Sequence, residues 1–350
     1  MRKSPKCELD TLDLPAKRAA TLVWLTDKET GIRIAVLPAA GGEIASFQAR
    51  LGGKWREILY RALDYRSAPP DGWDGRAPLL WPAVGRSFTD EQIAKWKRTG
   101  EKPTPCRYSL GGKSYNIPSH GFARNLPWEL GAFGHGADSA WVICSLTTSA
   151  ATRKMYPFDF ALSVRYTLAR GSITLRYEAT AGDNPRPMPF AIGNHISFRM
   201  PFTGKGRFED CSLRTPACRM LLQNEFRLLS GRSARVNLAR PTPLSRSEFL
   251  DAVLGGYLRN GAWLELADPA SLTLRVSHEE KSPGGKFFAR ERDLSFVFWG
   301  TPLYRYFCPE PWIGLPNALN TGRGVGLPAG ETFAWEICFT PLLPGRHDRK

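Results

Sequence analysis

Phe160-Ala161-Leu162-Ser163-Val164-Arg165-Tyr166-Thr167-Leu168 is the stretch that decides the fold class of this 350-residue chain. Large apolar side chains occupy every second position, with small or polar residues between them. The alternation resumes after Arg170-Gly171-Ser172 with Ile173, Leu175 and Tyr177. A period of two is typical of a strand with one buried face, and a connection that contains glycine suits a hairpin. The stretch therefore predicts two antiparallel strands.

The same alternation recurs on both sides of this hairpin. Strand-like segments lie at 32–36, 43–47, 262–266, 272–277, 294–299 and 333–339. Asp90–Arg98 predicts a helix instead, because its acids come first, its bases come last and Gly100 follows. Helices do not fit between most of the strands, so parallel βαβ units are not expected. We predict an all-β fold, an antiparallel sandwich or barrel with one or two short helices.

The chain offers no boundary between domains. We expect one domain over residues 1–350, with residues 1–20 as a loosely attached or edge-docked lead-in and residues 341–350 as a polar tail. Hydrophobic residues make up 42% of the chain and charged residues 23%, which is ordinary for a globular protein with a full core.

The composition also limits the partners. The net charge is +15, but Arg and Lys are dispersed and form no run of five or more, so a nucleic-acid partner is not expected. No apolar run approaches the roughly 20 residues that span a bilayer. The basic start is followed by polar residues 7–13 rather than the apolar core of a signal peptide, which predicts a cytoplasmic protein. Seven scattered cysteines without a Cys-x-x-Cys predict neither a disulfide framework nor a zinc site.

Three segments interrupt the alternation with residues that a core does not need. They are 119–128, 193–198 and 308–312, and each combines a titratable side chain with Gly, Pro or large aromatic residues. In a β fold, functional residues gather on loops and strand ends that a rigid scaffold holds in place. The two most suggestive groups are the imidazole of His195 and the carboxylate of Glu310.

These segments resemble, in order and at compatible spacing, the motifs of the aldose 1-epimerase (galactose mutarotase) family. The matching stretches are Trp81–Arg86, His120–Trp128, Pro189–His195, Phe249–Ala252, and Glu310–Gly314 followed by Leu327–Glu331. The resemblance covers almost the whole chain. It implies a β-supersandwich of antiparallel strands and a sugar epimerase that needs no cofactor or metal and takes a monosaccharide as its partner.

The resemblance also implies roles for individual residues. Glu310 matches the general base of the family and His195 its general acid. Arg86, His120 and Asp251 match residues that hold the sugar, and Trp312 offers an aromatic face for the apolar side of the ring. Taken alone, His195 could be a structural histidine, Asp251 a turn acid and Arg86 the partner of a structural carboxylate.

The chemistry explains why an acid and a base are needed. Anomer exchange opens a hemiacetal, so the anomeric hydroxyl loses a proton while the ring oxygen gains one, and positioned groups accelerate such steps by roughly 10²–10⁴. Because opposite charges close together favour both charged forms, we expect Glu310 to be ionised and His195 to lean towards imidazolium. His120, if protonated, and Arg86 can donate hydrogen bonds to sugar hydroxyls, and Asp251 can accept them.

Two alternatives remain beside a free-aldose epimerase. A hexose-6-phosphate 1-epimerase of the same fold would suit the basic charge and Arg124. A carbohydrate-binding or regulatory protein without turnover would not need the acid–base pair. The chain departs from the family pattern at Asn194, Ile196 and Pro309, which bears on specificity more than on the reaction. The sequence leaves the sugar and the oligomeric state open.

Overall fold

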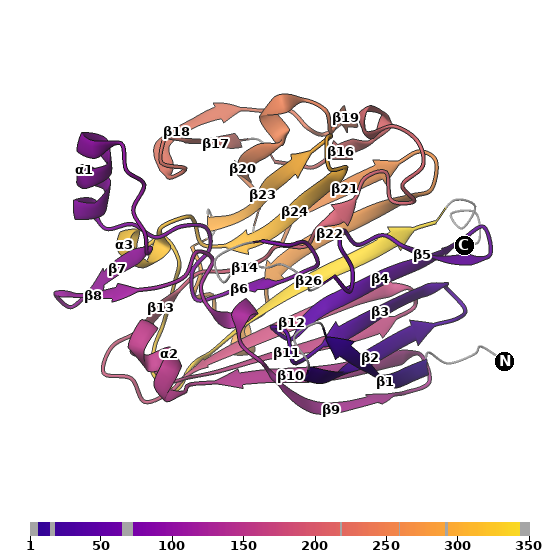
Figure 1. Cartoon of the computed structure of the whole chain (residues 1–350), viewed down its shortest axis with the longest axis horizontal. Helices are drawn as coiled ribbons and strands as arrows, with labels where there is room; N and C mark the ends of the chain where they lie inside the picture. Colours follow the sequence, from indigo (N-terminus) through magenta and orange to yellow (C-terminus); the bar gives the residue numbers. More distant parts are fainter. Residues whose placement is uncertain are drawn as a thin grey trace.

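Antiparallel strands dominate the computed structural model, which describes residues 6–14, 18–64, 73–217, 219–258, 260–290 and 293–343. Strands far outnumber helices, as the period-two pattern predicted, and every ladder between named strands is antiparallel. The strands form two large sheets, a five-stranded sheet and two small ribbons (Figure 1). The all-β prediction is therefore confirmed.

The predicted hairpin lies in the nine-stranded sheet. β11 (Phe160–Ala169) and β12 (Ser172–Ala181) pair from Phe160 opposite Ala181 to Ala169 opposite Ser172. The apolar positions of both strands are buried and the alternate ones are partly exposed, which explains the period of two. The other strands, in sheet order, are β19 (Thr242–Pro243), β16 (Ser212–Arg214), β21 (Trp263–Asp268), β22 (Leu272–Glu280), β26 (Thr332–Leu342), then beyond the hairpin β10 (Ser139–Thr147) and β9 (Glu129–His135).

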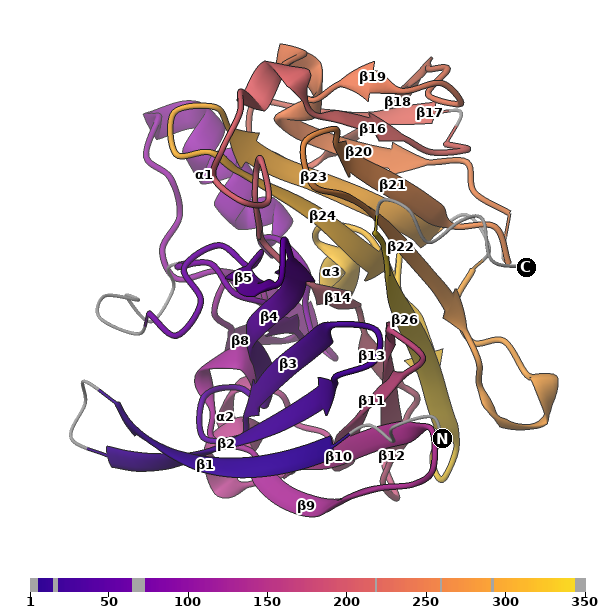
Figure 2. The ribbon, with the colours of Figure 1, turned by 90° about the vertical axis from the view of Figure 1, so that its right-hand side faces the viewer.

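The five-stranded sheet contains the N-terminal strands and packs against β10 and β11 (Figure 2). Its order is β1 (Lys6–Leu14), β2 (Arg18–Asp27), β3 (Ile32–Leu37), β4 (Glu43–Leu51) and β5 (Lys54–Glu57). β1 is an edge strand paired along its whole length with β2. Residues 1–5 and 15–17 of the predicted lead-in, and residues 344–350 of the predicted tail, lie outside the described residues.

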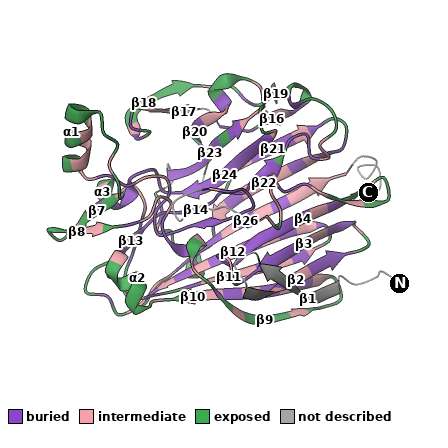
Figure 3. Cartoon of the chain, in the orientation of Figure 1, coloured by how far each residue is buried: buried purple, intermediate pink, exposed green. Residues whose placement is uncertain are grey.

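The eight-stranded sheet carries the two segments that hold His195 and Glu310. Its strands, in order, are β18 (Leu229–Arg235), β17 (Arg219–Gln223), β20 (Asp251–Gly255), β23 (Leu294–Thr301), β24 (Tyr306–Ile313), β14 (Ile192–Asn194) and β6 (Leu79–Leu80), with β15 (Phe198–Arg199) also paired to β24. Every residue of β24 is buried, whereas β18 is almost fully exposed at the edge (Figure 3). The central strands are therefore a rigid support for a site.

The helical prediction is confirmed at α1 (Asp90–Thr99). The Thr89 hydroxyl accepts a hydrogen bond from the backbone N–H of Gln92, and Gly100 ends the helix with φ +73°. The described residues contain two more short helices, α2 (Ala150–Met155) and α3 (Ala318–Thr321). Short elements complete the chain: β7 (Arg107–Leu110), β8 (Lys113–Asn116), β13 (Met188–Phe190), β25 (Val325–Leu327) and 3₁₀ turns at Ala123–Asn125, Phe208–Asp210, Ser247–Phe249 and Pro283–Gly285. Within the described ranges, no helix is long and apolar enough to cross a membrane.

Candidate active site

A cleft of about 470 Å³ contains all six residues singled out from the sequence. Its lining comprises Trp73, Gly85, Arg86, Ser119, His120, Arg124, His195, Gln223, Arg227, Asp251, Val253, Val297, Phe298, Trp299, Glu310, Trp312 and Pro316. The predicted residues come from segments more than 200 positions apart in the chain, and the sheet brings them together. The size suits a small ligand such as a monosaccharide.

Strand register explains why His195 meets Glu310. Ile192 lies opposite Ile313 in the β14–β24 ladder, and Phe198 lies opposite Phe307 in the β15–β24 ladder. The same register, continued between these two pairs, places His195 opposite Glu310. Residues opposite one another in a ladder point to the same face of the sheet. We call this side, which also carries Trp312, the cleft face.

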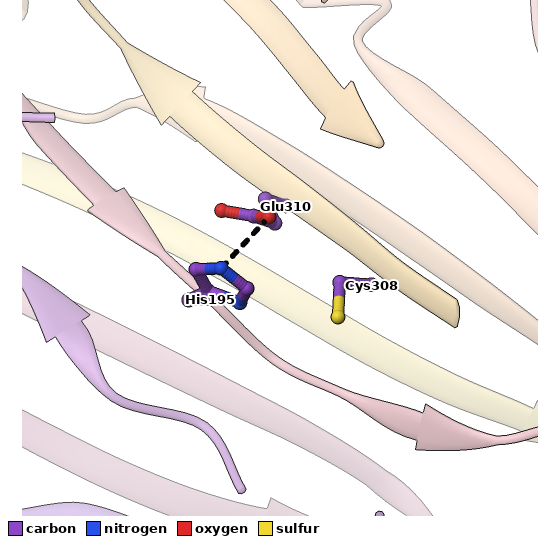
Figure 4. Close-up of side chains that lie close together, drawn as sticks. All are labelled: His195, Cys308 and Glu310. Carbon is purple, nitrogen blue, oxygen red and sulfur yellow. Dashed lines mark ion pairs between the residues drawn. The ribbon is translucent and has the colours of Figure 1, made fainter. Parts of the chain in front are cut away.

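The two side chains are in direct contact. The Nε2 atom of His195 lies 3.2 Å from Oε1 of Glu310, and both side chains are buried (Figure 4). The indole Nε1 of Trp312 donates to the other carboxylate oxygen of Glu310 at 3.2 Å. Because Trp312 is two residues further along the same strand, it shares the cleft face and fixes the carboxyl group. Trp312 thus contacts the candidate base and also lines the cleft.

His120 is held beside the pair by a loop-to-loop contact. Its backbone N–H donates to the carbonyl of Gly85, and the Gly85 N–H donates to Nδ1 of His120 at 3.1 Å. An accepting Nδ1 carries no proton, so the neutral ring has its N–H at Nε2. The ring centroid is 5.6 Å from that of His195. A protonated ring, considered in the sequence analysis, is therefore not needed for His120 to donate a hydrogen bond.

The next residue, Gly121, cannot be replaced by a larger one. Its φ is +73°, and a Cβ atom there would stand 2.1 Å from the carbonyl oxygen of Trp81. The glycine lets the His120 loop approach the loop that contains Gly85 and Arg86. This close approach is the physical reason for glycine in the His-Gly-Phe segment.

Asp251 and Arg86 lie at the walls of the cleft. Asp251 begins β20 and forms an ion pair with Arg227, a residue on the turn between β17 and β18. The Asp251 side chain is 35% exposed and the Arg227 side chain 50% exposed, so both reach solvent as well as each other. Arg86 and Arg124 also line the cleft. Among the described residues, three guanidinium groups and two carboxyl groups thus line the cleft.

Trp73, Gln223 and Arg227 also line the cleft and were not expected from the sequence. Trp73 places its ring centroid 5.2 Å from that of His195, at an interplanar angle of 30°. Gln223 and Arg227 come from β17 and the turn after it. The only available signal was an aromatic residue within a Pro- and Gly-rich loop at Trp73. Nothing in the local pattern of 219–235 indicates a cleft, because its position depends on pairing with β20.

Burial controls the protonation of the central pair. Burial first, and the positive charge of Arg124 second, lower the pKa of His195 to about 3. Burial also raises the pKa of Glu310 well above its usual value, against the opposing effects of the Trp312 hydrogen bond and Arg124. The pKa of His120 is held well below its usual range, first by burial and then by Arg124, His195 and Arg86. The desolvated site therefore favours neutral groups.

This finding corrects the expected charges. Mutual attraction was predicted to keep Glu310 ionised and His195 protonated, but neither side chain retains enough water to offset the cost of charge. A protonated Glu310 beside a neutral His195 holds the same number of protons as a carboxylate beside an imidazolium. The ion pair can thus form by moving one proton over the 3.2 Å contact, without exchange with solvent.

Comparison with known proteins gives the family. A sequence profile described as Aldose 1-epimerase matches residues 34–299, about three quarters of the chain. The chain belongs to the aldose 1-epimerase family. It is accordingly an epimerase that acts on carbohydrates. The resemblance and the all-β fold inferred from the sequence are both confirmed.

Relatives of this aldose 1-epimerase family member differ in how much of the chain they match. The protein LacX, plasmid, of Lactococcus lactis subsp. lactis is 28% identical over 280 residues, which covers 78% of this chain and 86% of LacX. A protein of Salmonella typhimurium, provisionally named a glucose-6-phosphate 1-epimerase, is 44% identical over 54 residues, which covers 15% of this chain and 18% of that protein.

Solved structures share the fold of this epimerase. A galactose mutarotase-like protein from Clostridium acetobutylicum has a TM-score of 0.72 at 16% identity, with 96% of this chain and 99% of that chain covered. The galactose 1-epimerase of Lactobacillus acidophilus NCFM has a TM-score of 0.69 at 16% identity, with 97% and 99% covered. At such identity the likeness shows the fold.

Proposed function

We propose that this epimerase interconverts the α and β anomers of an aldose, with Glu310 as general base and His195 as general acid. The observation that supports the proposal most is the direct contact of 3.2 Å between these buried groups at the floor of a sugar-sized cleft. Sugar binding alone does not require a buried acid–base pair, and maintaining such a pair costs stability. A role in proton transfer would explain why the chain has such a pair despite its effect on stability.

In the proposed reaction, the Glu310 carboxylate removes the proton from the anomeric hydroxyl. His195, as imidazolium, delivers its proton to the ring oxygen, and the bond between that oxygen and the anomeric carbon breaks. An aldehyde forms from the former hemiacetal carbon. Rotation about the adjacent carbon–carbon bond presents its other face, and the two residues then act in reverse to close the ring.

The ionic form of the pair is needed only when the sugar is bound. In the empty cleft, burial favours protonated Glu310 and neutral His195. Sugar hydroxyls at the pair supply dipoles that stabilise the charges formed by internal proton transfer. The enzyme therefore takes up no proton from solvent before ring opening. To react, the pair must hold one transferable proton besides the N–H of the neutral imidazole.

The surrounding residues have complementary roles in this proposal. The Nε2–H of His120 and the guanidinium of Arg86 donate to sugar oxygens, whereas Asp251 accepts from hydroxyls. Trp312 is assigned two functions, because its N–H orients Glu310 and its ring offers an apolar surface to the sugar. These assignments keep the roles expected from the sequence for all six residues.

The test is anomer exchange measured by NMR on a panel of unphosphorylated aldoses. The wild-type protein should accelerate exchange of at least one sugar, and Glu310→Gln should lower kcat by roughly 10²–10⁴ while sugar affinity changes by less than about 10-fold. An active Glu310→Gln protein would overturn the assigned base. Binding of a sugar by wild-type protein without any acceleration would instead favour the non-catalytic alternative.

A second substrate class is favoured by one feature of the cleft. Within the described ranges, Arg86, Arg124 and Arg227 line it together with two carboxyl groups, Asp251 and Glu310. Guanidinium groups bind phosphate through paired hydrogen bonds, so a hexose phosphate is the second candidate. Including glucose 6-phosphate in the same panel separates the two classes by their kcat/KM values. Arg86→Gln should selectively weaken the phosphorylated substrate if that class is correct.

A further inference from the structure

The thiol of Cys308 lies next to the acid–base pair and has no part in ring opening. Cys308 is two residues before Glu310 on β24 and therefore points to the cleft face, where the ladder register places it opposite Ser197. One donor atom from each of His195, Cys308 and Glu310 lies within 4.8 Å of the other two. Figure 4 shows the three side chains grouped between the same strands.

We infer that His195, Cys308 and Glu310 form a binding site for a thiophilic divalent metal ion of the zinc type. Imidazole, thiolate and carboxylate are the three kinds of protein ligand that zinc accepts. Sites with three protein ligands leave the fourth tetrahedral position open. Two of the three proposed ligands, His195 and Glu310, line the cleft. The sequence did not indicate such a site because its ligands come from register rather than from a Cys-x-x-Cys spacing.

The distances suit this ion. Zinc binds nitrogen and oxygen at about 2.0–2.2 Å, so two such ligands on a tetrahedron stand roughly 3.3 Å apart. The Nε2 atom of His195 and Oε1 of Glu310 are already 3.2 Å apart. The zinc–sulfur bond is longer, about 2.3 Å, and small side-chain rotations would bring the Cys308 sulfur to that distance.

Charge balance favours a divalent ion in this dry setting. A thiolate, a carboxylate and a neutral imidazole together carry two negative charges, which a divalent cation neutralises. Each of the three residues is at least 95% buried, with 5%, 0% and 1% exposure for His195, Cys308 and Glu310. A buried charge is tolerated when a metal compensates it, so the complex would carry no net charge.

One hydrogen-bonding detail also suits metal binding. The thiol of Cys308 donates to the hydroxyl of Ser197 at 3.3 Å. Once the sulfur is deprotonated, that hydroxyl can turn and donate to it, which is the kind of outer contact that supports metal ligands.

The bound ion would compete with the sugar reaction, a consequence that rests on the proposed function. Zinc would occupy the lone pairs that Glu310 and His195 use for proton transfer, so it should inhibit anomer exchange. Binding must also displace the protons of the thiol and the carboxyl group. Because metal binding releases these protons, zinc affinity should increase with pH.

The test titrates the whole chain with Co²⁺ and Zn²⁺ alone. Co²⁺ bound at this site should show a thiolate-to-metal charge-transfer band, which Zn²⁺ abolishes by displacement, and calorimetry should give one Zn²⁺ per chain with proton release. These readouts do not depend on any sugar, so they remain valid if the proposed function fails. Wild-type protein without the charge-transfer band would overturn the inference regardless of how any variant folds.

Variants identify the ligands. Cys308→Ser should lower Zn²⁺ affinity at least about 10-fold and remove the charge-transfer band, and its anomer exchange without metal should stay near wild-type. Cys338→Ser is the matched control, because Cys338 is a half-buried thiol on β26 that contacts Thr340 instead of a histidine or carboxylate. Equal Zn²⁺ affinity in wild-type and Cys308→Ser proteins would overturn the assignment. Equal losses in both cysteine variants would overturn it as well.

Discussion

His195 and His278 are two buried histidines that have similar exposure and similarly shifted pKa values but different neighbouring side chains. Their exposed fractions are 5% and 3%, and burial lowers the pKa of each to about 3. One nitrogen of each ring lacks a hydrogen-bond partner among the described residues, Nδ1 in His195 and Nε2 in His278. Burial, a nitrogen without a hydrogen-bond partner and a shifted pKa therefore do not distinguish the proposed catalytic histidine from a core one.

The neighbours make the difference. His278 packs edge-on against Phe296 at 4.8 Å between ring centroids, and its Nδ1 accepts from the indole N–H of Trp335 at 3.2 Å. His195 contacts the carboxyl group of Glu310 and lines the cleft. A proton donor needs a second titratable group and access to substrate, and only His195 has both. The chemistry of the neighbouring side chain, rather than burial, therefore separates His195 from His278.

The largest expected effect comes from exchanging the same side chain at the two positions. His195→Asn should lower kcat for anomer exchange by roughly 10²–10⁴, because the ring oxygen loses its proton donor. His278→Asn should leave kcat within about 3-fold where the protein is folded, yet lower the free energy of unfolding by about 1–3 kcal/mol through lost packing and hydrogen bonding. Anomer-exchange kinetics and thermal unfolding of both variants measure the two effects. Equal activity losses would refute the distinction.

The β class of the fold and the interest of His195 could be predicted from the sequence alone. The period-two pattern of residues 160–177 sufficed for the β class because side-chain alternation is a local property of strands. The resemblance to the family motifs predicted His195 and Glu310 as the acid and the base. His278 lies beside Glu279 and Glu280, outside the three segments that interrupt the alternation, and no role is expected for it from the sequence.

Other features of the site were beyond reach of the sequence. The charge state of Glu310 was predicted wrongly because it depends on desolvation, which only the packed structure reveals. Cys308 was missed since its proximity to His195 follows from ladder register between distant strands. Arg227 enters the cleft on a turn after β17, and its place is set by pairing with β20.

A smaller effect is expected at the cleft wall. Asp251→Asn should raise KM by about 10-fold with a lesser change in kcat, because it weakens a hydrogen-bond acceptor for the sugar and breaks the ion pair with Arg227. Asp138→Asn is the matched control, since Asp138 pairs with Arg170 on the exposed surface. Steady-state kinetics of both variants test the assignment. A fall in kcat alone would contradict a binding role for Asp251.

The buried carboxyl group of Glu310 should also lower the stability of the fold in a pH-dependent way. Burial raises the folded-state pKa of Glu310 above its ordinary value of 4.5. The folded protein then holds this proton more tightly than the unfolded chain, so the carboxyl group destabilises the fold increasingly as pH rises above 4.5. Glu310→Gln removes that penalty. We expect its melting temperature to exceed that of the wild type at pH 8, and the difference to shrink towards zero at pH 4.

The control for this experiment is Glu331→Gln, which removes a partly exposed carboxylate paired with Lys286. Surface ion pairs contribute little to stability. The free energy of unfolding of this variant should therefore stay within about 1 kcal/mol of the wild-type value at both pH values. Thermal unfolding by circular dichroism at pH 4 and pH 8 gives all the comparisons. A Glu310→Gln protein that is less stable than wild type at pH 8 would show that burial of the carboxyl group is fully compensated.

The smallest expected effect concerns Trp73, the aromatic neighbour of His195. It lines the cleft, whereas the aromatic neighbours of His278 lie in the core. Trp73 lies across His195 at 5.2 Å with a tilt of 30°. Aromatic contacts of this type contribute about 0.5–1.5 kcal/mol, so Trp73→Phe should raise KM only about 2- to 10-fold. Trp141→Phe, on β10 and stacked with Arg165, controls for general loss of indole. If Trp73 instead orders the His195 ring, kcat will fall while KM stays unchanged, which would move Trp73 from sugar binding to support of the proposed acid.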